Sequence, residues 1–166
     1  TVYIDITKMG GRVLLMNYNK SVYEENINVD DAKKYAVEFL NNHGFDNMEA
    51  SYYTVENGAV TINFAYTQNG VICYSDLIKV KVALDNGEIL GLETRGYLNS
   101  HMVRELQQPK IDVNEARKII NNTVEITSER LALIPTEWAT EILVYEFKGK
   151  VDGRNFIVYV DVNTGK

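Results

Sequence analysis

The sequence predicts an α+β protein built from tandem copies of one unit, in which a helix packs on an antiparallel β-meander. A strand-and-turn phrase recurs with Asp5, Ala83 and Asp161 in equivalent places, 78 residues apart each time. The helix start at residues 27–32 is repeated at residues 111–116. Asn-Gly and Asp-Gly pairs separate runs of alternating apolar residues, a pattern typical of hairpins. Even spacing of such units predicts tandem domains.

The first half of the chain begins with a predicted hairpin, strands 2–7 and 12–16, followed by a polar linker. We expect a helix to begin after Asn28, whose side chain can accept the free amide groups of the first turn, and to end before Gly44. Its predicted buried face recurs at steps of three and four residues and consists of Ala32, Tyr35, Ala36, Phe39 and Leu40.

Four strands are predicted next, at residues 48–55, 59–67, 71–84 and 89–97. The helix starts lie 84 residues apart but the closing strands only 78. We attribute this difference to a longer loop in the first copy, at residues 74–76.

The second copy begins after Pro109. Asp112 caps its helix and Glu115 completes an approximate capping box, while Ala116, Ile119 and Ile120 form a short buried face. Strands are predicted at residues 124–134, 141–148 and 156–162. The predicted domains are residues 1–18, the closing hairpin of a truncated upstream unit, residues 19–98, the first full repeat, and residues 99–166, the second.

Composition indicates an ordered globular protein, because 45% of the 166 residues are apolar and 24% are charged. The net charge of −6 and the absence of a basic stripe argue against nucleic acid as a partner. Cys73 is the only cysteine, which excludes an internal disulfide and a cysteine-based zinc cluster. No apolar stretch approaches the length of a membrane span, so membrane attachment is expected only through an N-terminal anchor outside these residues.

Motifs of catalysis are missing from the sequence: there is no Gly-x-Ser-x-Gly, no His-Glu-x-x-His and no phosphate-binding loop. Only His43 and His101 could serve a histidine-based site. Ser100 precedes His101, but neighbours on an extended chain point to opposite faces, so we interpret the pair as structural or exposed. We therefore predict no catalytic residue, no cofactor and no metal. Asp5 and Asp161 are expected to stabilise turns.

Aromatic residues are the remaining feature, since the chain has eleven tyrosines and one tryptophan. Such rings form core edges or, when desolvated by a partner, binding anchors. We single out Tyr97 with His101, and Arg130 with Glu137, as candidate partner-binding residues. Packing between the repeats is the alternative interpretation of these four positions.

The capped helix, the meander and the closing Val-x-Val-Asp-x-x-Thr-Gly turn together resemble the PepSY domain family, which implies tandem PepSY-like units. Longer runs, at residues 76–88, 96–101, 130–137 and 141–149, resemble the C-terminal part of the YpeB family of spore germination proteins. This resemblance implies a protein of endospore-forming bacteria that is not an enzyme. In that family a membrane anchor and a helical region precede the repeats.

The resemblance also implies a partner, the cortex-lytic enzyme SleB, with each protein needed for the other's presence in the dormant spore. The implied location is extracytoplasmic, at the outer face of the inner spore membrane or in the cortex region. PepSY units also occur in propeptides of secreted metalloproteases, so a peptidase-inhibitory module is the alternative. An enzyme in its own right is a further alternative, against which the missing motifs argue. Open strand edges at the first hairpin also suggest a homo-oligomer.

Overall fold

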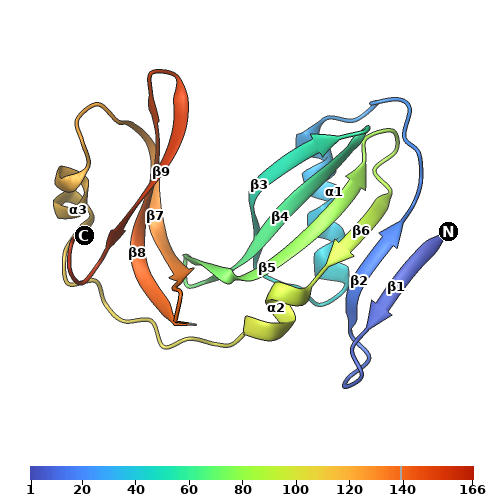
Figure 1. The fold of residues 1–166 in the computed structure, drawn as a ribbon, viewed down its shortest axis with the longest axis horizontal. Helices are drawn as coiled ribbons and strands as arrows, with labels where there is room; N and C mark the ends of the chain where they lie inside the picture. Colours follow the sequence, from blue (N-terminus) through green and yellow to red (C-terminus); the bar gives the residue numbers. More distant parts are fainter. Residues whose placement is uncertain (139) are drawn as a thin grey trace. The chain divides into compact units, whose positions relative to one another are not determined.

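The computed structural model describes residues 1–138 and 140–166, which form two compact units of mixed helix and sheet (Figure 1). The first unit comprises Thr1–Thr67 and Ser75–Met102, and the second comprises Gln68–Tyr74 and Val103–Lys166. The predicted α+β class is confirmed. The hairpin tip at residues 68–74 belongs to the second unit although both flanking segments belong to the first. The repeat boundaries placed at residues 18/19 and 98/99 stay a prediction.

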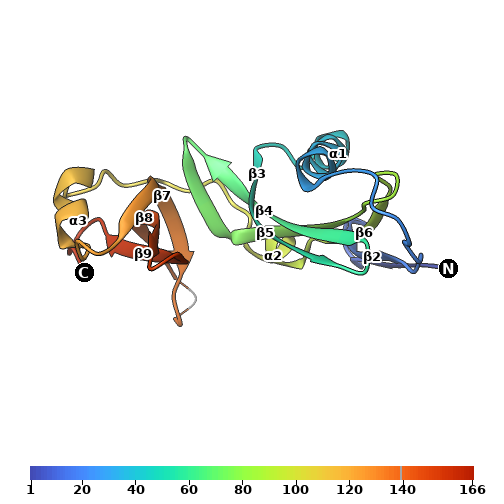
Figure 2. The same cartoon turned by 90° about the horizontal axis from the view of Figure 1, so that it is seen from above.

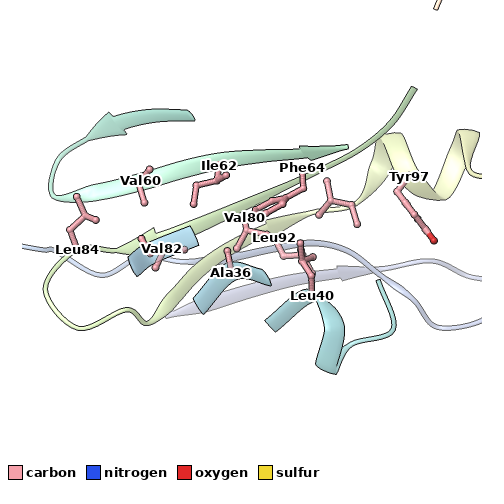
Figure 3. Close-up of a cluster of buried hydrophobic side chains, with 12 residues drawn as sticks. Ala36, Leu40, Val60, Ile62, Phe64, Val80, Val82, Leu84, Leu92 and Tyr97 are labelled. Carbon is pink, nitrogen blue, oxygen red and sulfur yellow. The ribbon is translucent and has the colours of Figure 1, made fainter. Parts of the chain in front are cut away.

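In the first unit, one face of a twisted sheet carries the long helix α1 (Val29–Asn42), as Figure 2 shows. The strand order is β1 (Val2–Ile6), β2 (Val13–Tyr18), β6 (Ile89–Glu93), β5 (Val71–Ala83), β4 (Ala59–Gln68) and β3 (Met48–Glu56). The core lies between the helix and the sheet (Figure 3), and its side chains include Ala36, Leu40, Val60, Ile62, Phe64, Val80, Val82, Leu84, Leu92 and Tyr97.

Helix α1 begins and ends where its sequence predicts. The Asn28 side chain accepts a hydrogen bond from the Asp31 amide at 2.9 Å, and Gly44, with φ of +76°, follows the last turn. Ala32, Ala36 and Leu40 are fully buried, as expected. The first and last turns of this helix therefore follow from local chemistry alone.

Two residues of the predicted helix faces are half exposed instead of buried. Tyr35 is 44% exposed and Ile119 is 52% exposed. Tyr35 covers the turn at Gly87, where an added Cβ would lie 2.7 Å from its ring, and Ile119 covers Gly165, where that distance is 3.3 Å. Both side chains thus lie beside the closing turn of their unit and remain partly exposed to water.

The strand predicted at residues 89–97 is shorter than expected. β6 ends at Glu93, and a helix, α2 (Arg95–Ser100), follows it. The buried Thr94 hydroxyl donates to the Val13 carbonyl oxygen at 2.6 Å, which satisfies that group where the strand ends. A Cβ on Gly96 would lie 2.9 Å from the Leu77 carbonyl oxygen, so α2 approaches the β5 backbone at a distance that only glycine permits.

The loop expected at residues 74–76 is absent, because β5 is continuous through these residues. The helices carry the length difference between the copies instead. Helix α1 has 14 residues, whereas α3 (Val113–Ile119) has 7. The shorter helix buries only Ala116, whereas α1 buries Ala32, Ala36 and Leu40.

The second unit packs α3 against a sheet of β7 (Glu125–Pro135), β8 (Glu141–Val151) and β9 (Arg154–Asp161). Neighbouring strands among these three are antiparallel. The start of β5 adds a short parallel pairing with β7, where Ile72 and Cys73 lie opposite Ala132 and Leu133. Asp112 caps α3, and Glu115 closes the predicted capping box by accepting from the Asp112 amide at 3.1 Å.

Both units close with the same backbone hydrogen bonds, which confirms the tandem repeat at atomic level. In the first unit the Gly87 amide donates to the Ala83 carbonyl oxygen (3.0 Å), and the Ala83 amide donates to the Glu88 carbonyl oxygen (2.9 Å). The amides of Asn26 and Ile27 both donate to the Leu84 carbonyl oxygen, at 2.8 and 2.9 Å. In the second unit the Gly165 amide donates to the Asp161 carbonyl oxygen (2.9 Å), and the Asp161 amide donates to the Lys166 carbonyl oxygen (2.9 Å). The amides of Lys110 and Ile111 both donate to the Val162 carbonyl oxygen, at 3.0 and 3.1 Å. The segment before each helix is thus fastened to the turn that ends its sheet.

The expected turn role of Asp161 is confirmed, because its carboxylate accepts from the amides of Asn163 at 2.6 Å and Thr164 at 2.9 Å. At the first hairpin a different side chain, that of Thr7, makes the turn bond. Its hydroxyl accepts from the Arg12 amide at 3.0 Å, and Asp5 lies opposite Leu15 within the β1–β2 pairing.

Candidate partner-binding site

The first candidate cluster lies at the end of α2 and joins Tyr97, His101, Asp76 and Tyr66. One helical turn separates Tyr97 from His101, so their rings stack with centroids 4.1 Å apart and an angle of 12°. The Tyr66 ring meets the His101 ring edge-on at 4.6 Å. The structure therefore brings the predicted pair Tyr97 and His101 together, and a partner role for them stays a prediction.

A buried carboxylate fixes the orientation of the histidine. His101 Nδ1 lies 2.8 Å from Asp76 Oδ2, and the Asp76 side chain is fully buried while the His101 side chain is 28% exposed. Burial, and then the Asp76 charge, raises the pKa of Tyr97 above its ordinary value. Tyr97 also meets Phe45 edge-on at 5.2 Å and is part of the core. Ser100 and His101 end a helix, so the extended-chain argument does not apply to them.

The second candidate cluster is a buried ion pair in the second unit. Arg130 on β7 lies directly opposite Glu146 on β8, with Arg130 Nε 2.9 Å from Glu146 Oε1. The Tyr74 hydroxyl donates to Glu146 Oε2 at 2.6 Å, and Lys148 Nζ lies 3.7 Å from Glu146 Oε1. The Glu146 side chain is only 1% exposed. Burial, together with the hydrogen bond to this carboxylate, raises the pKa of Tyr74 well above its ordinary value.

Glu137 lies elsewhere, in the turn between β7 and β8, and it is exposed. The register places Pro135 opposite Glu141 at the end of the hairpin, five residues beyond Arg130. Extended strands rise about 3.3 Å per residue, so roughly 16 Å of strand separates Arg130 from Pro135, where the turn with Glu137 begins. The structure thus does not bring the predicted pair Arg130 and Glu137 together.

Sequence reasoning missed the buried carboxylates Asp76 and Glu146 and a further polar group around Arg104. Arg104 is 8% exposed although it lies in a segment without regular structure. Its Nε and Nη2 donate to the two Glu141 oxygens at 2.6 and 2.8 Å, and its backbone exchanges bonds with the Gln68 side chain. The sequence offers one signal for the second cluster, since Arg130 and Glu146 lie in adjacent predicted strands. Whether they pair depends on the strand register, which the sequence does not give.

The other predicted polar residues have structural surroundings. Cys73 is buried, as expected. His43 caps the end of α1, and its Nδ1 lies 2.7 Å from the Phe39 carbonyl oxygen. In the described part of the chain, no group of three or more His, Cys, Asp or Glu side chains could hold a metal ion. No helix within residues 1–138 and 140–166 is long and apolar enough to cross a membrane.

The fold and its closing turns define a class: this is a tandem α+β repeat protein of the PepSY type. A family model described as "YpeB sporulation, PepSY1 and PepSY2 domains" matches residues 1–107, and one described as "Peptidase propeptide and YPEB domain" matches residues 110–166. The chain therefore belongs to the YpeB family of sporulation proteins.

Similar proteins agree with this assignment. The chain is 33% identical over 164 residues to the sporulation protein YpeB of Halalkalibacterium halodurans and 33% identical over 166 residues to that of Bacillus subtilis. Each alignment covers 99% of this chain but only 37% of the length of the relative. The solved C-terminal domain of Bacillus megaterium YpeB has a TM-score of 0.90 and 30% identity, with 99% of this chain and 73% of that chain covered. These relatives confirm the expected resemblance and indicate a sporulation protein.

Proposed function

We propose that this chain is a non-catalytic, partner-binding module of a spore germination protein, and that it acts with the cortex-lytic enzyme SleB. In this proposal the module keeps the enzyme stable and retained in the dormant spore. The observation that carries the proposal is the match of residues 1–107 to the YpeB family model, together with sporulation relatives that align over 99% of the chain.

The two polar clusters have roles within the fold of their units. His101 Nδ1 contacts the fully buried Asp76, and Arg130 is bonded to the buried Glu146. An acid or base used in catalysis must reach the proton it transfers. Both carboxylates are enclosed by their own unit and cannot themselves reach a substrate: Asp76 orients the partly exposed His101, and Glu146 compensates the charge of Arg130.

Retention of purified SleB by this immobilised chain tests the proposal, with survival of the enzyme in dormant spores as the second readout. We expect the chain to retain SleB and spores that lack the full-length protein to lose the enzyme. Absence of retention, combined with normal enzyme levels in those spores, would sink the proposal. A cell-wall degradation assay with the chain alone should show no release of cortex fragments.

We also propose an extracytoplasmic location, at the outer face of the inner spore membrane or in the cortex region, reached through an N-terminal anchor outside these residues. The sporulation relatives support a spore-associated place, and each is longer than this chain, which covers 37% of its length. Accessibility of the full-length protein to an added protease in decoated spores checks the side of the membrane.

A peptidase-inhibitory module is the second candidate function. The description of the family that matches residues 110–166 includes peptidase propeptides, which favours this alternative. Inhibition of a thermolysin-like metalloprotease by the purified chain decides between the two. Unchanged protease activity at a large molar excess of the chain removes this candidate.

Association of two copies through β1 is a further proposal. β1 is an edge strand of the first unit, and Val2, Tyr3 and Ile4 on it are each more than half exposed. Sedimentation of the chain at increasing concentration checks this, with Ile4→Pro as the variant that removes an edge amide donor. A chain that stays monomeric at high concentration contradicts the proposal.

A further inference from the structure

The turn between β7 and β8 presents the single tryptophan of the chain to solvent. Trp138 is 85% exposed. Tryptophan is highly buried on average in folded proteins, and it is among the residues that contribute most binding energy when a partner desolvates them. The position follows directly on Glu137, one of the predicted partner residues.

Hydrogen bonds join the residues on either side of Trp138. The Thr136 amide donates to the Thr140 carbonyl oxygen at 2.8 Å, and the hydroxyl oxygens of these two threonines lie 2.7 Å apart. The Trp138 amide also donates to the Thr136 hydroxyl oxygen at 3.3 Å. Hydrogen bonds that restrain a segment before binding reduce the conformational entropy lost on binding, so these contacts favour Trp138 as an anchor.

A second exposed apolar residue lies at the same end of the hairpin. Arg104 is fastened to Glu141, the first residue of β8, by two hydrogen bonds of 2.6 and 2.8 Å. Val103 precedes Arg104 and is 79% exposed. The buried Arg104 side chain thus fixes an otherwise irregular segment beside the start of β8 and leaves Val103 in water.

We propose that Trp138, Glu137 and Val103, here named the Trp138 tip, form the surface with which the second unit binds its partner protein. This inference rests on the proposed function and adds a site to it. Trp138 inserts into an apolar pocket of the partner hydrolase, and Lys or Arg side chains on the pocket rim complement Glu137. The net charge of −6 on the chain favours the same complementarity.

The charge of the tip favours a protein partner over a lipid surface. Tryptophan also concentrates at membrane interfaces, but anionic lipid headgroups attract basic residues and repel acidic ones. Glu137 adjoins Trp138 and is exposed, so approach to an anionic bilayer brings like charges together.

Because the chain has one tryptophan, labelling with 5-fluorotryptophan gives a single ¹⁹F resonance from the tip. We expect purified, unlabelled SleB to shift or broaden this resonance and vesicles of phosphatidylglycerol to leave it unchanged. Trp138→Ala should weaken SleB binding at least about thirtyfold, which is the lower limit for an interface hot spot. Tyr23→Ala is the matched control, since Tyr23 is 92% exposed in the first unit, and it should leave the affinity within about twofold.

Glu137→Lys tests the charge argument and should weaken binding more at low salt than at high salt. Circular dichroism of each variant checks that the fold is kept, which is expected because Trp138 and Glu137 are exposed. Retention of SleB with an unmoved ¹⁹F resonance and an unaffected Trp138→Ala variant overturns the Trp138 tip but leaves the proposed function standing. A shift with vesicles alone overturns it in favour of a membrane contact. A wild-type chain that retains no SleB overturns the proposed function, and this assignment fails with it.

Discussion

Glu146 is a charged residue that is almost completely buried. Its side chain is 1% exposed, and its carboxylate is hydrogen-bonded to Arg130 and Tyr74. Removing one member of a buried ion pair leaves the other charge without compensation. We predict that Glu146→Ala lowers the free energy of unfolding of the second unit by about 3 kcal/mol. Denaturation in urea measures this change.

Glu137→Ala is the matched control for Glu146, because Glu137 is exposed on the same hairpin, and it should change the unfolding free energy by no more than about 0.5 kcal/mol. The double variant Arg130→Leu with Glu146→Leu should recover part of the lost stability, since it removes both charges at once. A loss of under about 1 kcal/mol for Glu146→Ala contradicts the structural role of the pair.

Because of Tyr74, the free energy of unfolding of the second unit depends on pH in the alkaline range. Its pKa is raised in the folded chain by burial and by the Glu146 carboxylate, whereas the unfolded chain releases this proton near the ordinary value of 10.0. Above that pH the unfolded state binds fewer protons than the folded state, so the free energy of unfolding falls as pH rises toward the folded pKa. The contribution is fully present below about pH 10.

We predict that Tyr74→Phe flattens the decline of unfolding free energy between about pH 10 and pH 12, because phenylalanine has no proton to release. Urea titrations at fixed pH values give the slope. Tyr3→Phe, at a position that is 64% exposed, is the comparison variant and should keep the wild-type slope. Equal slopes for Tyr74→Phe and the wild type argue against the role of the buried hydroxyl.

At the scale of elements, the closing turns depend on a glycine for two separable reasons. Gly87 has φ of +79°, and a Cβ there would meet the Tyr35 ring at 2.7 Å, whereas Gly10 has φ of +78° with nothing within 4 Å. We predict that Gly10→Ala costs about 1 kcal/mol, from the left-handed backbone alone. Gly87→Ala should cost about 1 kcal/mol more, because Tyr35 must leave the turn.

The double variant Gly87→Ala with Tyr35→Ala separates the two reasons, since it removes the collision and leaves the backbone cost. Its effect should be smaller than the sum of the single variants, as thermal or urea unfolding would measure. If the double variant instead loses the sum of the two single-variant effects, the Tyr35 ring does not restrict this turn.

At the scale of the whole molecule, the hairpin tip at residues 68–74 is part of the second unit. Ile72 and Cys73 pair with β7, and Tyr74 bonds to Glu146. We predict that residues 99–166 expressed alone are markedly less stable than the second unit within the intact chain, because Ala132, Leu133 and Glu146 lose these contacts. Residues 68–166 are the matched comparison, and amide NMR spectra with urea unfolding give the readout. Equal stability of the two fragments contradicts the assignment of the tip to this unit.

The sequence by itself determined the repeat, both helix caps, the Asn-Gly and Asp-Gly hairpins and most of the buried faces, because each depends on residues close together in the chain. Tertiary structure decided the rest. Arg130 meets Glu146 and not Glu137 because of strand register, and His101 meets Asp76 where Gly96 lets α2 approach the β5 backbone closely. Tyr35 and Ile119 cover turns that lie about 50 residues away in the chain, at Gly87 and Gly165. Such pairings join distant segments, and periodicity fixes which face a residue occupies but not which distant residue it meets.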